Sequence, residues 1–272
     1  MGRRKPLACF GVAIVTTGSL VCGNGSAAAG QADYTGAEER SAGSQIALHE
    51  GVHGKPPTGR YAPAEQTLGH DVSGWQSDVD WPKASAAGAK FVYVKATEGT
   101  GFTSDKFAQQ YNGSYRAGLV RGAYHFARPD VSGGAAQADY FIENGGGWSP
   151  DGKTLPGALD IEYNPYGETC YGKDPAAMTA WIKDFSDTYA ERTGRAPVIY
   201  TSTSWWEKCT GNSAEFGGAN PLWLARYAPE IGPLPAGWAT QTIWQFADSG
   251  ELPGDQNYFN GNRERIGKLA GG

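Results

Sequence analysis

The sequence predicts an α/β fold in which strands alternate with helices. Short apolar runs rich in β-branched and aromatic residues recur along the chain, and segments of helical composition separate them. This alternation predicts parallel strands in a closed barrel or in an open doubly wound sheet. Nearly every expected strand ends on a polar or aromatic residue, which favours the barrel, where such ends converge on one mouth. The dinucleotide-binding form of the open sheet lacks its signature, because no Gly-x-Gly-x-x-Gly opens a helix after the first strand.

Residues 1–29 have the layout of a secretory signal peptide. The basic start Arg3-Arg4-Lys5 precedes an apolar stretch over residues 7–21, and small residues follow as far as Ala29. The apolar stretch is interrupted by polar residues and is short for a membrane span. We therefore expect a secreted, extracellular protein that has no membrane association after signal removal. A twin-arginine signal and a lipidation site at Cys22 stay open as variants, although the neighbouring residues fit both motifs poorly.

Residues 30–66 differ in composition from the rest of the chain. They are rich in Gly, Ala, Ser, Glu and Pro and have no sustained periodicity, so we expect a flexible linker or propeptide. Residues 67–272 are long enough for one substantial core and are expected to form a single domain. The formal net charge is −5, and removal of the basic signal would make the chain more acidic. An acidic chain without a Lys/Arg run is a poor candidate for binding nucleic acid.

The cysteines are consistent with export. Cys9 and Cys22 lie in the expected signal peptide, which leaves Cys170 and Cys209 as one pair. We predict a disulfide between Cys170 and Cys209. A zinc site would need more Cys or His nearby, so we expect no metal. No cofactor is expected either.

The expected strands and helices follow one another through the domain. The strands are residues 91–96, 120–126, 155–162, 197–201, 221–226 and 242–246. Residues 104–117 and 134–144 have helical composition, and residues 174–192 form the clearest helix. Its apolar stripe consists of Met178, Trp181, Ile182, Phe185 and Tyr189. Asp174 is placed to cap the start of this helix, Pro175 suits its first position, and Gly194 is expected to end it.

Asp160 and Glu162 are the strongest candidates for catalysis. They alternate with Ile161, so a strand would place both carboxyl groups on one face, with Cα atoms about 6.6 Å apart. The apolar residues before them indicate a buried strand that becomes polar where it leaves the core. Two such acids can cleave a glycosidic bond, since one protonates the leaving oxygen while the other stabilises the oxocarbenium ion. By itself the pair is weak support, because most such pairs are solvated strand ends.

Five segments of the chain form an ordered set of motifs. They are residues 69–76 (GHDVSGWQ), 95–99 (KATEG), 121–126 (RGAYHF), 159–162 (LDIE) and 243–246 (IWQF). Together they resemble glycoside hydrolase family 25, the Chalaropsis-type lysozymes, over about residues 68–269. The resemblance implies an irregular (β/α) TIM-like barrel with its active site at the C-terminal ends of the strands. It also implies hydrolysis of the β-1,4 bond between N-acetylmuramic acid and N-acetylglucosamine in peptidoglycan, with net retention.

The resemblance assigns roles to four acids. Glu162 would be the general acid/base, and Asp160 would be either a nucleophile or the group that orients and stabilises the substrate's acetamido group. Asp71, at the end of the first strand, and Asp255, in the final segment 255–259 (DQNYF), would complete the cluster. Asp248 precedes Asp255 and is expected in a plain turn. Clustered carboxylates repel one another, which raises the pKa of at least one and supplies an acid near neutral pH.

Further residues are candidates for substrate binding. At strand ends these are Lys95, Glu98 and Gln245, and the aromatic candidates are Tyr93, Tyr124, Tyr163, Tyr200 and Trp223. Glu98 is either a substrate contact or the partner of Lys95. Each aromatic side chain either lines a groove or packs in the core. His125 is expected to be a hydrogen-bonded structural histidine, because the four histidines are scattered.

Two other functions stay open. A chitinase would share the acetamido-assisted chemistry, but the longer series of alternating acids that is typical of its strand is incomplete here. A carbohydrate-binding module without activity would need no acid, and the presence of both Asp160 and Glu162 disfavours it. The favoured partner is the glycan strand of peptidoglycan. We expect a monomer, the usual state of an enzyme that binds its substrate in a groove.

Overall fold

The strands close into a barrel, as their polar ends predict. The computed structural model describes residues 1–2, 40–52 and 66–272, and the structural statements below concern these residues. The eight barrel strands are β1 (Thr67–Val72), β2 (Phe91–Glu98), β4 (Val120–Phe126), β5 (Ala158–Asp160), β6 (Val198–Thr201), β7 (Leu222–Ala225), β8 (Ile243–Ala247) and β9 (Asp255–Phe259). They are bonded in the order β1-β9-β8-β7-β6-β5-β4-β2, and the pairing of β2 with β1 closes the ring. The open sheet is therefore excluded, and the α/β barrel is confirmed.

The barrel is irregular at β9. This strand runs antiparallel to both β1 and β8, whereas the other barrel strands pair in parallel. Gly254 precedes it with a φ of +75°, and a Cβ at this position would overlap the carbonyl group of Asp71. Glycine is therefore required for the chain to turn back against β1. The sequence analysis did not predict β9, and β3 (Phe102–Thr103) adds only a short hairpin to β2.

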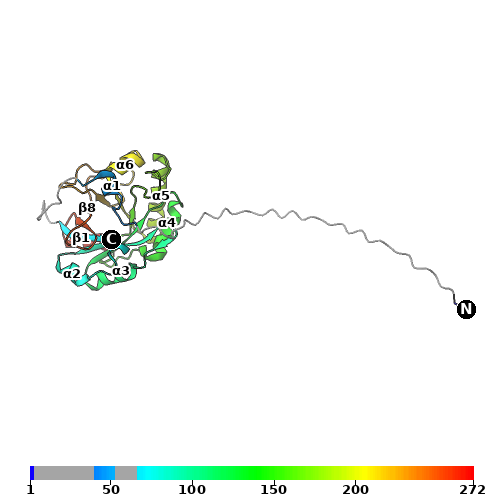
Figure 1. Ribbon diagram of the computed structural model, residues 1–272, viewed down its shortest axis with the longest axis horizontal. Helices are drawn as coiled ribbons and strands as arrows, with labels where there is room; N and C mark the ends of the chain where they lie inside the picture. Colours follow the sequence, from blue (N-terminus) through cyan, green and yellow to red (C-terminus); the bar gives the residue numbers. More distant parts are fainter. Residues whose placement is uncertain (3–39, 53–65) are drawn as a thin grey trace.

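Helices surround the barrel (Figure 1). They are α2 (Trp81–Ala86), α3 (Phe107–Arg116), α4 (Gly134–Phe141), α5 (Pro175–Thr193), α6 (Thr203–Thr210) and α7 (Arg263–Gly271), with a 3-10 turn η1 (Gly74–Gln76) and a π turn η2 (Ile142–Gly146). The prediction for α5 is confirmed: Asp174 accepts the Ala177 N–H at 2.8 Å, and Gly194 ends the helix with a φ of +76°. Its expected apolar stripe is buried. Among the described residues, no helix has the length and apolar composition to cross a membrane.

Aromatic side chains fill the inside of the barrel around Trp223. The rings of Tyr93 and Tyr200 each lie 4.8 Å from the Trp223 ring, measured between centroids, and the Tyr124 ring lies 6.4 Å away. All four residues are fully buried. Such packing gives a rigid floor to the open end of the barrel.

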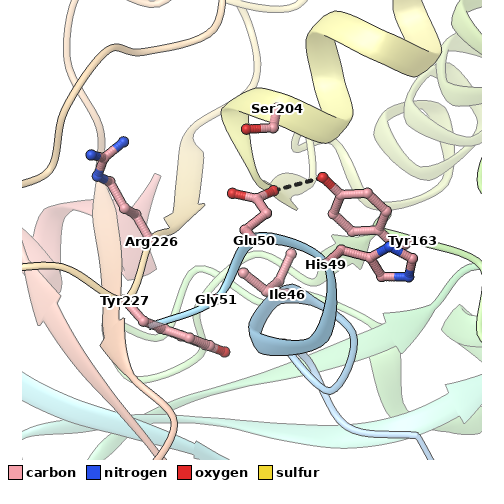
Figure 2. Close-up of a pocket in the computed structure, with 8 residues that line it drawn as sticks. All are labelled: Ile46, His49, Glu50, Gly51, Tyr163, Ser204, Arg226 and Tyr227. Carbon is pink, nitrogen blue, oxygen red and sulfur yellow. Dashed lines mark hydrogen bonds between the residues drawn. The ribbon is translucent and has the colours of Figure 1, made fainter. Parts of the chain in front are cut away.

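Residues 40–52 lie across the end of the barrel where the carboxyl ends of the parallel strands meet, which we call the mouth. They contain a turn followed by α1 (Ile46–Glu50), and α1 lies near the start of α6 (Figure 1). Ala42 and Ile46 are buried, with 0% and 1% of their surface exposed. Figure 2 shows α1 against side chains from several loops of the mouth. This part of the stretch expected as a flexible linker or propeptide is thus ordered on the barrel.

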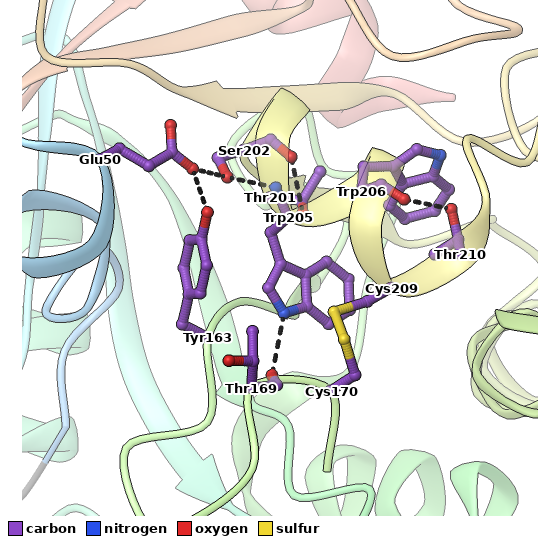
Figure 3. Close-up of a disulfide and its surroundings, with 10 residues drawn as sticks. All are labelled: Glu50, Tyr163, Thr169, Cys170, Thr201, Ser202, Trp205, Trp206, Cys209 and Thr210. Carbon is purple, nitrogen blue, oxygen red and sulfur yellow. Dashed lines mark hydrogen bonds between the residues drawn. A yellow bond between two sulfur atoms is a disulfide. The ribbon is translucent and has the colours of Figure 1, made fainter. Parts of the chain in front are cut away.

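The predicted disulfide between Cys170 and Cys209 is present. It joins the loop after β5 to α6, with the two Cα atoms 5.4 Å apart (Figure 3). Beside it, the Trp205 indole N–H donates to the carbonyl of Thr169 at 3.3 Å. The loop that follows Glu162 is therefore fastened to a neighbouring helix both covalently and by a hydrogen bond.

Candidate active site

Asp160 and Glu162 lie where the chain leaves the barrel at the end of β5. The strand ends at Asp160, and the next residue still pairs, because the Ile161 N–H donates to the Tyr200 carbonyl at 3.0 Å. Glu162 lies beyond the strand, which corrects the expectation of a strand that continues to residue 162. Both acids are buried, with 1% and 0% of their surface exposed.

The carboxyl group of Glu162 is held by the backbone of the segment over the mouth. The Gly43 N–H donates to Oε1 at 2.7 Å, and the Gln45 N–H donates to Oε2 at 3.2 Å. Burial raises the pKa of Glu162 to about 8, although these two hydrogen bonds act in the opposite direction. The neighbouring charges of Glu50 and Asp71 raise the pKa further. Glu162 is thus a group that can keep its proton near neutral pH and donate it.

Asp160 has no hydrogen-bond partner for either carboxylate oxygen among the described residues. Burial raises its pKa well above the ordinary value, the charge of Glu162 adds to this rise, and Lys95 opposes it. A buried carboxyl group without partners is rare, because each unsatisfied oxygen costs free energy. Such a group is free to accept a bond or a charge from a substrate.

Asp71 and Asp255 share one amide as a donor. Gln245 Nε2 donates to Asp71 Oδ2 at 2.9 Å and to Asp255 Oδ2 at 3.2 Å. Asn257 Nδ2 also donates to Asp71 Oδ2, at 2.6 Å. Burial raises the pKa of Asp71 to about 7 against these hydrogen bonds. The pKa of Asp255 lies well above its ordinary value because of burial and then because of the charge of Asp71.

Gln245 is fixed from its other side by two tyrosines. The hydroxyl groups of Tyr200 and Tyr227 donate to its Oε1 atom, at 2.7 Å and 2.9 Å. The amide orientation is therefore determined, with Nε2 directed at the acids. The sequence analysis named Gln245 as a substrate-binding candidate, and the structure places it as the link between two of the acids.

The structure brings the four candidate acids together. Asp160 is affected by the charges of Glu162 and Asp71, and Asp255 by those of Asp71 and Glu162. Their mutual repulsion favours neutral forms, so protons are available in the mouth near neutral pH. Across residues 40–52 and 66–272, no group of His, Cys, Asp or Glu has an arrangement suited to a metal ion.

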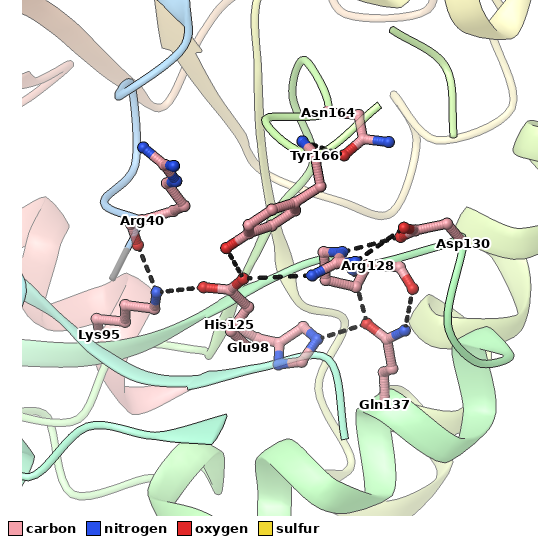
Figure 4. A network of polar contacts seen from close by, with 9 residues as sticks. All are labelled: Arg40, Lys95, Glu98, His125, Arg128, Asp130, Gln137, Asn164 and Tyr166. Atoms are coloured by element: carbon pink, nitrogen blue, oxygen red, sulfur yellow. Dashed lines mark hydrogen bonds and ion pairs between the residues drawn. The ribbon is translucent and has the colours of Figure 1, made fainter. Parts of the chain in front are cut away.

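A second polar cluster lies beside the acids, and in it Glu98 is paired with the cations Lys95 and Arg128 (Figure 4). Lys95 Nζ lies 2.7 Å from Glu98 Oε2 and also donates to the backbone carbonyl of Arg40. The Tyr166 hydroxyl donates to Glu98 Oε1 at 2.6 Å, and Arg128 lies 3.8 Å from the same oxygen. Of the two alternatives for Glu98, its position fits the partner of Lys95.

His125 has a structural position, as predicted. Its Nδ1 atom lies 2.8 Å from the Thr97 hydroxyl and its Nε2 atom 2.9 Å from Gln137 Oε1. Burial lowers the pKa of His125 to about 3, so the ring is neutral. Both nitrogens are engaged within the protein, which leaves neither for a substrate.

The aromatic candidates divide between the core and the mouth. Tyr93 and Trp223 belong to the barrel interior, where the Tyr93 hydroxyl donates to the Pro156 carbonyl at 2.9 Å. Tyr124 and Tyr163 face residues 40–52: the Ala42 N–H donates to the Tyr124 hydroxyl at 3.2 Å, and the Tyr163 hydroxyl donates to Glu50 at 2.9 Å. Tyr124 and Tyr163 are therefore placed to contact a ligand that occupies the mouth, and the Tyr200 hydroxyl also reaches it, since it lies 2.9 Å from the Cβ position of Gly43.

Several residues of the site were not identified in the sequence. They are Asn257, Tyr227, Tyr166, Arg128 and the segment 40–52. For Asn257 a signal existed, because it follows Asp255 by two residues and therefore lies on the same face of β9. The others lie in loops or far along the chain from the acids, where no spacing rule applies.

A barrel with buried acids at the carboxyl ends of its strands, one of them placed to retain a proton, has the fold and site of a glycoside hydrolase. The model of the family described as glycosyl hydrolases family 25 matches residues 70–255. This chain belongs to that family.

Relatives of this chain are described as a lysozyme, an N,O-diacetylmuramidase and a muramidase. Lysozyme M1 of Streptomyces globisporus is 41% identical over 280 residues, which cover 99% of this chain and 95% of the relative. The N,O-diacetylmuramidase of a Chalaropsis species is 51% identical over 208 residues, which cover 75% of this chain and 99% of the relative. The solved structure of a muramidase from Acremonium alcalophilum is 56% identical, with a TM-score of 0.74, and covers 75% of this chain and 99% of that chain.

Proposed function

We propose that this protein is a secreted lysozyme that hydrolyses the β-1,4 bond between N-acetylmuramic acid and N-acetylglucosamine in peptidoglycan, with net retention. The observation on which this rests is the pairing of two different buried acids at the end of β5. Glu162 keeps a proton near neutral pH, and Asp160 has no hydrogen-bond partner among the residues that the structure describes. The relatives described as lysozyme and N,O-diacetylmuramidase support the choice of substrate.

In the first step of the proposed reaction, Glu162 gives its proton to the bridging oxygen as the glycosidic bond breaks. Positive charge then develops at the sugar's anomeric carbon, and Asp160, in its ionised form, is assigned to face it. It either bonds to that carbon or accepts a hydrogen bond from the N–H of the substrate's acetamido group, which orients and stabilises this group as its oxygen attacks the carbon. In the second step Glu162 takes a proton from water, and the water oxygen attacks the same carbon. The bond from that carbon to Asp160 or to the acetamido oxygen breaks as it does so, which restores the starting configuration.

Asp71 and Asp255 are proposed to position the reacting groups. Gln245 and Asn257 hold the carboxyl group of Asp71 at a fixed place beside Asp160 and Glu162. A negative charge on Asp71 or Asp255 would raise the pKa of the general acid and stabilise a nearby oxocarbenium ion. Tyr124 and Tyr163 are the aromatic residues best placed to contact a glycan in the mouth.

Export is supported by two features. The expected signal peptide lies almost entirely outside the described residues, so its support for export comes from its layout in the sequence alone. The Cys170–Cys209 disulfide is typical of an oxidising compartment. We propose that the protein acts outside the cell as a monomer on the glycan strands of peptidoglycan.

The function can be tested with a chain of residues 66–272. This chain contains the whole closed barrel, and the solved Acremonium alcalophilum muramidase shows that a matching chain folds without further residues, since 75% of this chain covers 99% of it. It would be incubated with purified peptidoglycan, the products reduced, and the sugar at each new reducing end identified. New muramic acid ends support the proposal. New glucosamine ends, no cleavage, or cleavage of chitin oligomers alone would contradict it.

Glu162→Gln is the matching test of mechanism. The variant should fold and lose activity by about 10²- to 10⁴-fold, because general acid catalysis supplies about this much. Glu191→Gln, at an exposed position on α5, is the control and should keep full activity. The configuration of the first product, followed by proton NMR before mutarotation, tests retention. Wild-type turnover in Glu162→Gln would remove Glu162 from the proposed role.

A further inference from the structure

Residues 40–52, which we call the mouth segment, bind the proposed general acid directly. Their Gly43 and Gln45 N–H groups donate to the two carboxylate oxygens of Glu162, and Glu162 has no exposed surface. A general acid must present its proton to the leaving oxygen of the substrate. With both oxygens accepting hydrogen bonds from the backbone, Glu162 cannot reach a glycan in this arrangement.

The turn at Gly43 fits the mouth closely. Gly43 has a φ of +83°, and a Cβ there would overlap the Tyr227 hydroxyl and lie 2.7 Å from Gln245 Oε1. The Tyr227 hydroxyl oxygen lies 3.3 Å from the Gly43 carbonyl oxygen, and Gln245 Nε2 lies 3.4 Å from the Ala42 carbonyl. The turn therefore enters the mouth as far as the amide that holds Asp71 and Asp255, and only glycine fits at its tip.

Both ends of the mouth segment are anchored to candidate substrate-binding residues. At its start, the carbonyl of Arg40 accepts from Lys95. At its end, the His49 ring stacks on the Tyr163 ring, with centroids 4.1 Å apart and an angle of 4° between the planes. Glu50 accepts hydrogen bonds from the hydroxyl groups of Tyr163 and Ser202.

The space that remains beside the mouth segment is small. A cavity of about 210 Å³ lies between α1 and the rim, and Tyr163, Arg226 and Tyr227 line its barrel side (Figure 2). Ligand sites usually have about 300 to 1,000 Å³. Neither Asp160 nor Glu162 lines this cavity. Asp160 and Glu162 have 1% and 0% of their surface exposed with the mouth segment in place, so a glycan strand cannot contact either acid in this arrangement.

We propose that the mouth segment is an intramolecular inhibitor of the enzyme. In the full chain it occupies the substrate groove and holds Glu162, and activity requires that it leave the mouth. This inference rests on the proposed function, because it assumes that the groove binds peptidoglycan. The barrel does not need the segment for its fold, since the strands close within residues 67–259 and the Acremonium alcalophilum muramidase is matched almost entirely by 75% of this chain.

The test compares the full chain with residues 66–272 in peptidoglycan turnover. We expect the full chain to be at least about tenfold slower, which corresponds to an open mouth in a tenth of the molecules or fewer. Gly43→Ala in the full chain should recover most of the difference. Gly51→Ala is a matched control: Gly51 also has a positive φ, of +75°, but no atom of the described residues lies within 4 Å of its Cβ position. It should stay as slow as the full chain.

Hydrogen exchange at the Gly43 and Gln45 amides reports the position of the mouth segment independently of turnover. Both amides should be protected in the full chain and in Gly51→Ala, and exposed in Gly43→Ala. Ile46→Asp, which introduces a charge at a buried position, provides a second way to expel the segment. It should produce the same exposure and the same gain in turnover.

The outcomes separate the two proposals. If residues 66–272 do not cleave peptidoglycan, the proposed function fails, and amide protection still reports whether the segment fills the mouth. If residues 66–272 and the full chain are equally active, the function stands and the inhibitor is excluded. Release of the segment in Gly43→Ala and Ile46→Asp without a rise in turnover also overturns the inhibitor.

Discussion

Two sets of carboxyl groups, one of them the single residue Glu98, lie side by side in this barrel, and they differ in the charges that face them. In the ion-paired group, Glu98 contacts Lys95 at 2.7 Å, Arg128 at 3.8 Å and the Tyr166 hydroxyl at 2.6 Å. In the acid group, defined as Asp71, Asp160, Glu162 and Asp255, the hydrogen bonds come from amides, and Asp160 has none among the described residues.

The difference shows that burial alone does not mark a catalytic carboxyl group. A buried charge is tolerated when cations and hydrogen bonds compensate for lost hydration, and the Lys95–Glu98 pair satisfies this condition. The acid group lacks such compensation, so its members bind protons more tightly, and the pKa of Glu162 rises to about 8. Proton transfer near neutral pH requires groups of the second kind. The structure therefore separates an ion-paired carboxylate from four acids that have no ion pair among the described residues.

The largest effect that tests this comparison is expected for Asp160→Asn in residues 66–272. Loss of a preorganised charge at the reacting centre should reduce turnover of peptidoglycan by about 10²- to 10³-fold. The melting temperature should stay the same or rise, because Asp160 loses no hydrogen bond within the protein and the substitution removes a buried acid. Turnover and thermal unfolding would be measured on the same samples.

Asp187→Asn, at an exposed position on α5, is the control for this substitution. It should leave turnover unchanged. If Asp160→Asn unfolds at a markedly lower temperature and keeps wild-type turnover, Asp160 belongs with the stabilising carboxylates, and the distinction between the two groups is wrong.

The second prediction concerns the ion-paired group. Lys95→Met in residues 66–272 should lower the free energy of unfolding by about 3 to 5 kcal/mol, because it leaves Glu98 buried without its closest cation. The shorter chain is chosen because Lys95 also contacts Arg40 in the mouth segment. Lys268→Met removes a cation from the exposed pair with Glu264 at 2.9 Å and should not change the urea midpoint.

Equal midpoints for the two lysine variants would show that the Lys95–Glu98 pair contributes no more than a surface pair. The contrast with the acid group would then have to come from Arg128 and Tyr166 alone. A loss in Lys95→Met with no loss in Lys268→Met is the expected result.

Local sequence signals predicted much of the fold. β4 has the predicted bounds, and α5 begins and ends at its predicted caps, because strand composition and capping act within a few residues. Asp160 and Glu162 were also identified from their local spacing, whereas the roles of Asp71 and Asp255 came from the resemblance to the family. β9 was missed because it pairs with β1 and β8, and these two strands come together only when the whole barrel closes. Closure brings together strands from the two ends of the domain, and no local pattern encodes it.

The mouth segment was missed for a related reason. Its contacts cross large separations in sequence, 82 residues from Ala42 to Tyr124 and 119 residues from Gly43 to Glu162. Most of its hydrogen bonds to the barrel come from backbone groups, which every residue possesses. Composition therefore indicated a linker or propeptide, while the complementarity is visible only in three dimensions.

The smallest predicted effect concerns how two neighbouring residues of β1, Asp71 and His70, change the dependence of stability on pH. Burial raises the pKa of Asp71 from 3.8 to about 7 and lowers the pKa of His70 from 6.5 to about 4. Between about pH 4 and 6.5 the folded protein keeps a proton on Asp71 that the unfolded chain loses, so Asp71 makes stability fall as pH rises. His70 has the opposite effect, because here the unfolded chain binds the proton that the folded protein excludes.

Asp71→Asn should therefore make the slope of unfolding free energy against pH more positive, and His70→Asn should make it more negative. Each change is at most about 1.4 kcal/mol per pH unit, the value for one proton. Asparagine can still accept from Gln245 at position 71, and at position 70 it can supply the donor for the Pro253 carbonyl, which lies 2.7 Å from His70 Nδ1. Urea unfolding at several pH values in this range measures both slopes. Slopes that change in the same direction would show that burial does not shift the two pKa values in opposite directions. The raised pKa values of the acid group would then be without support.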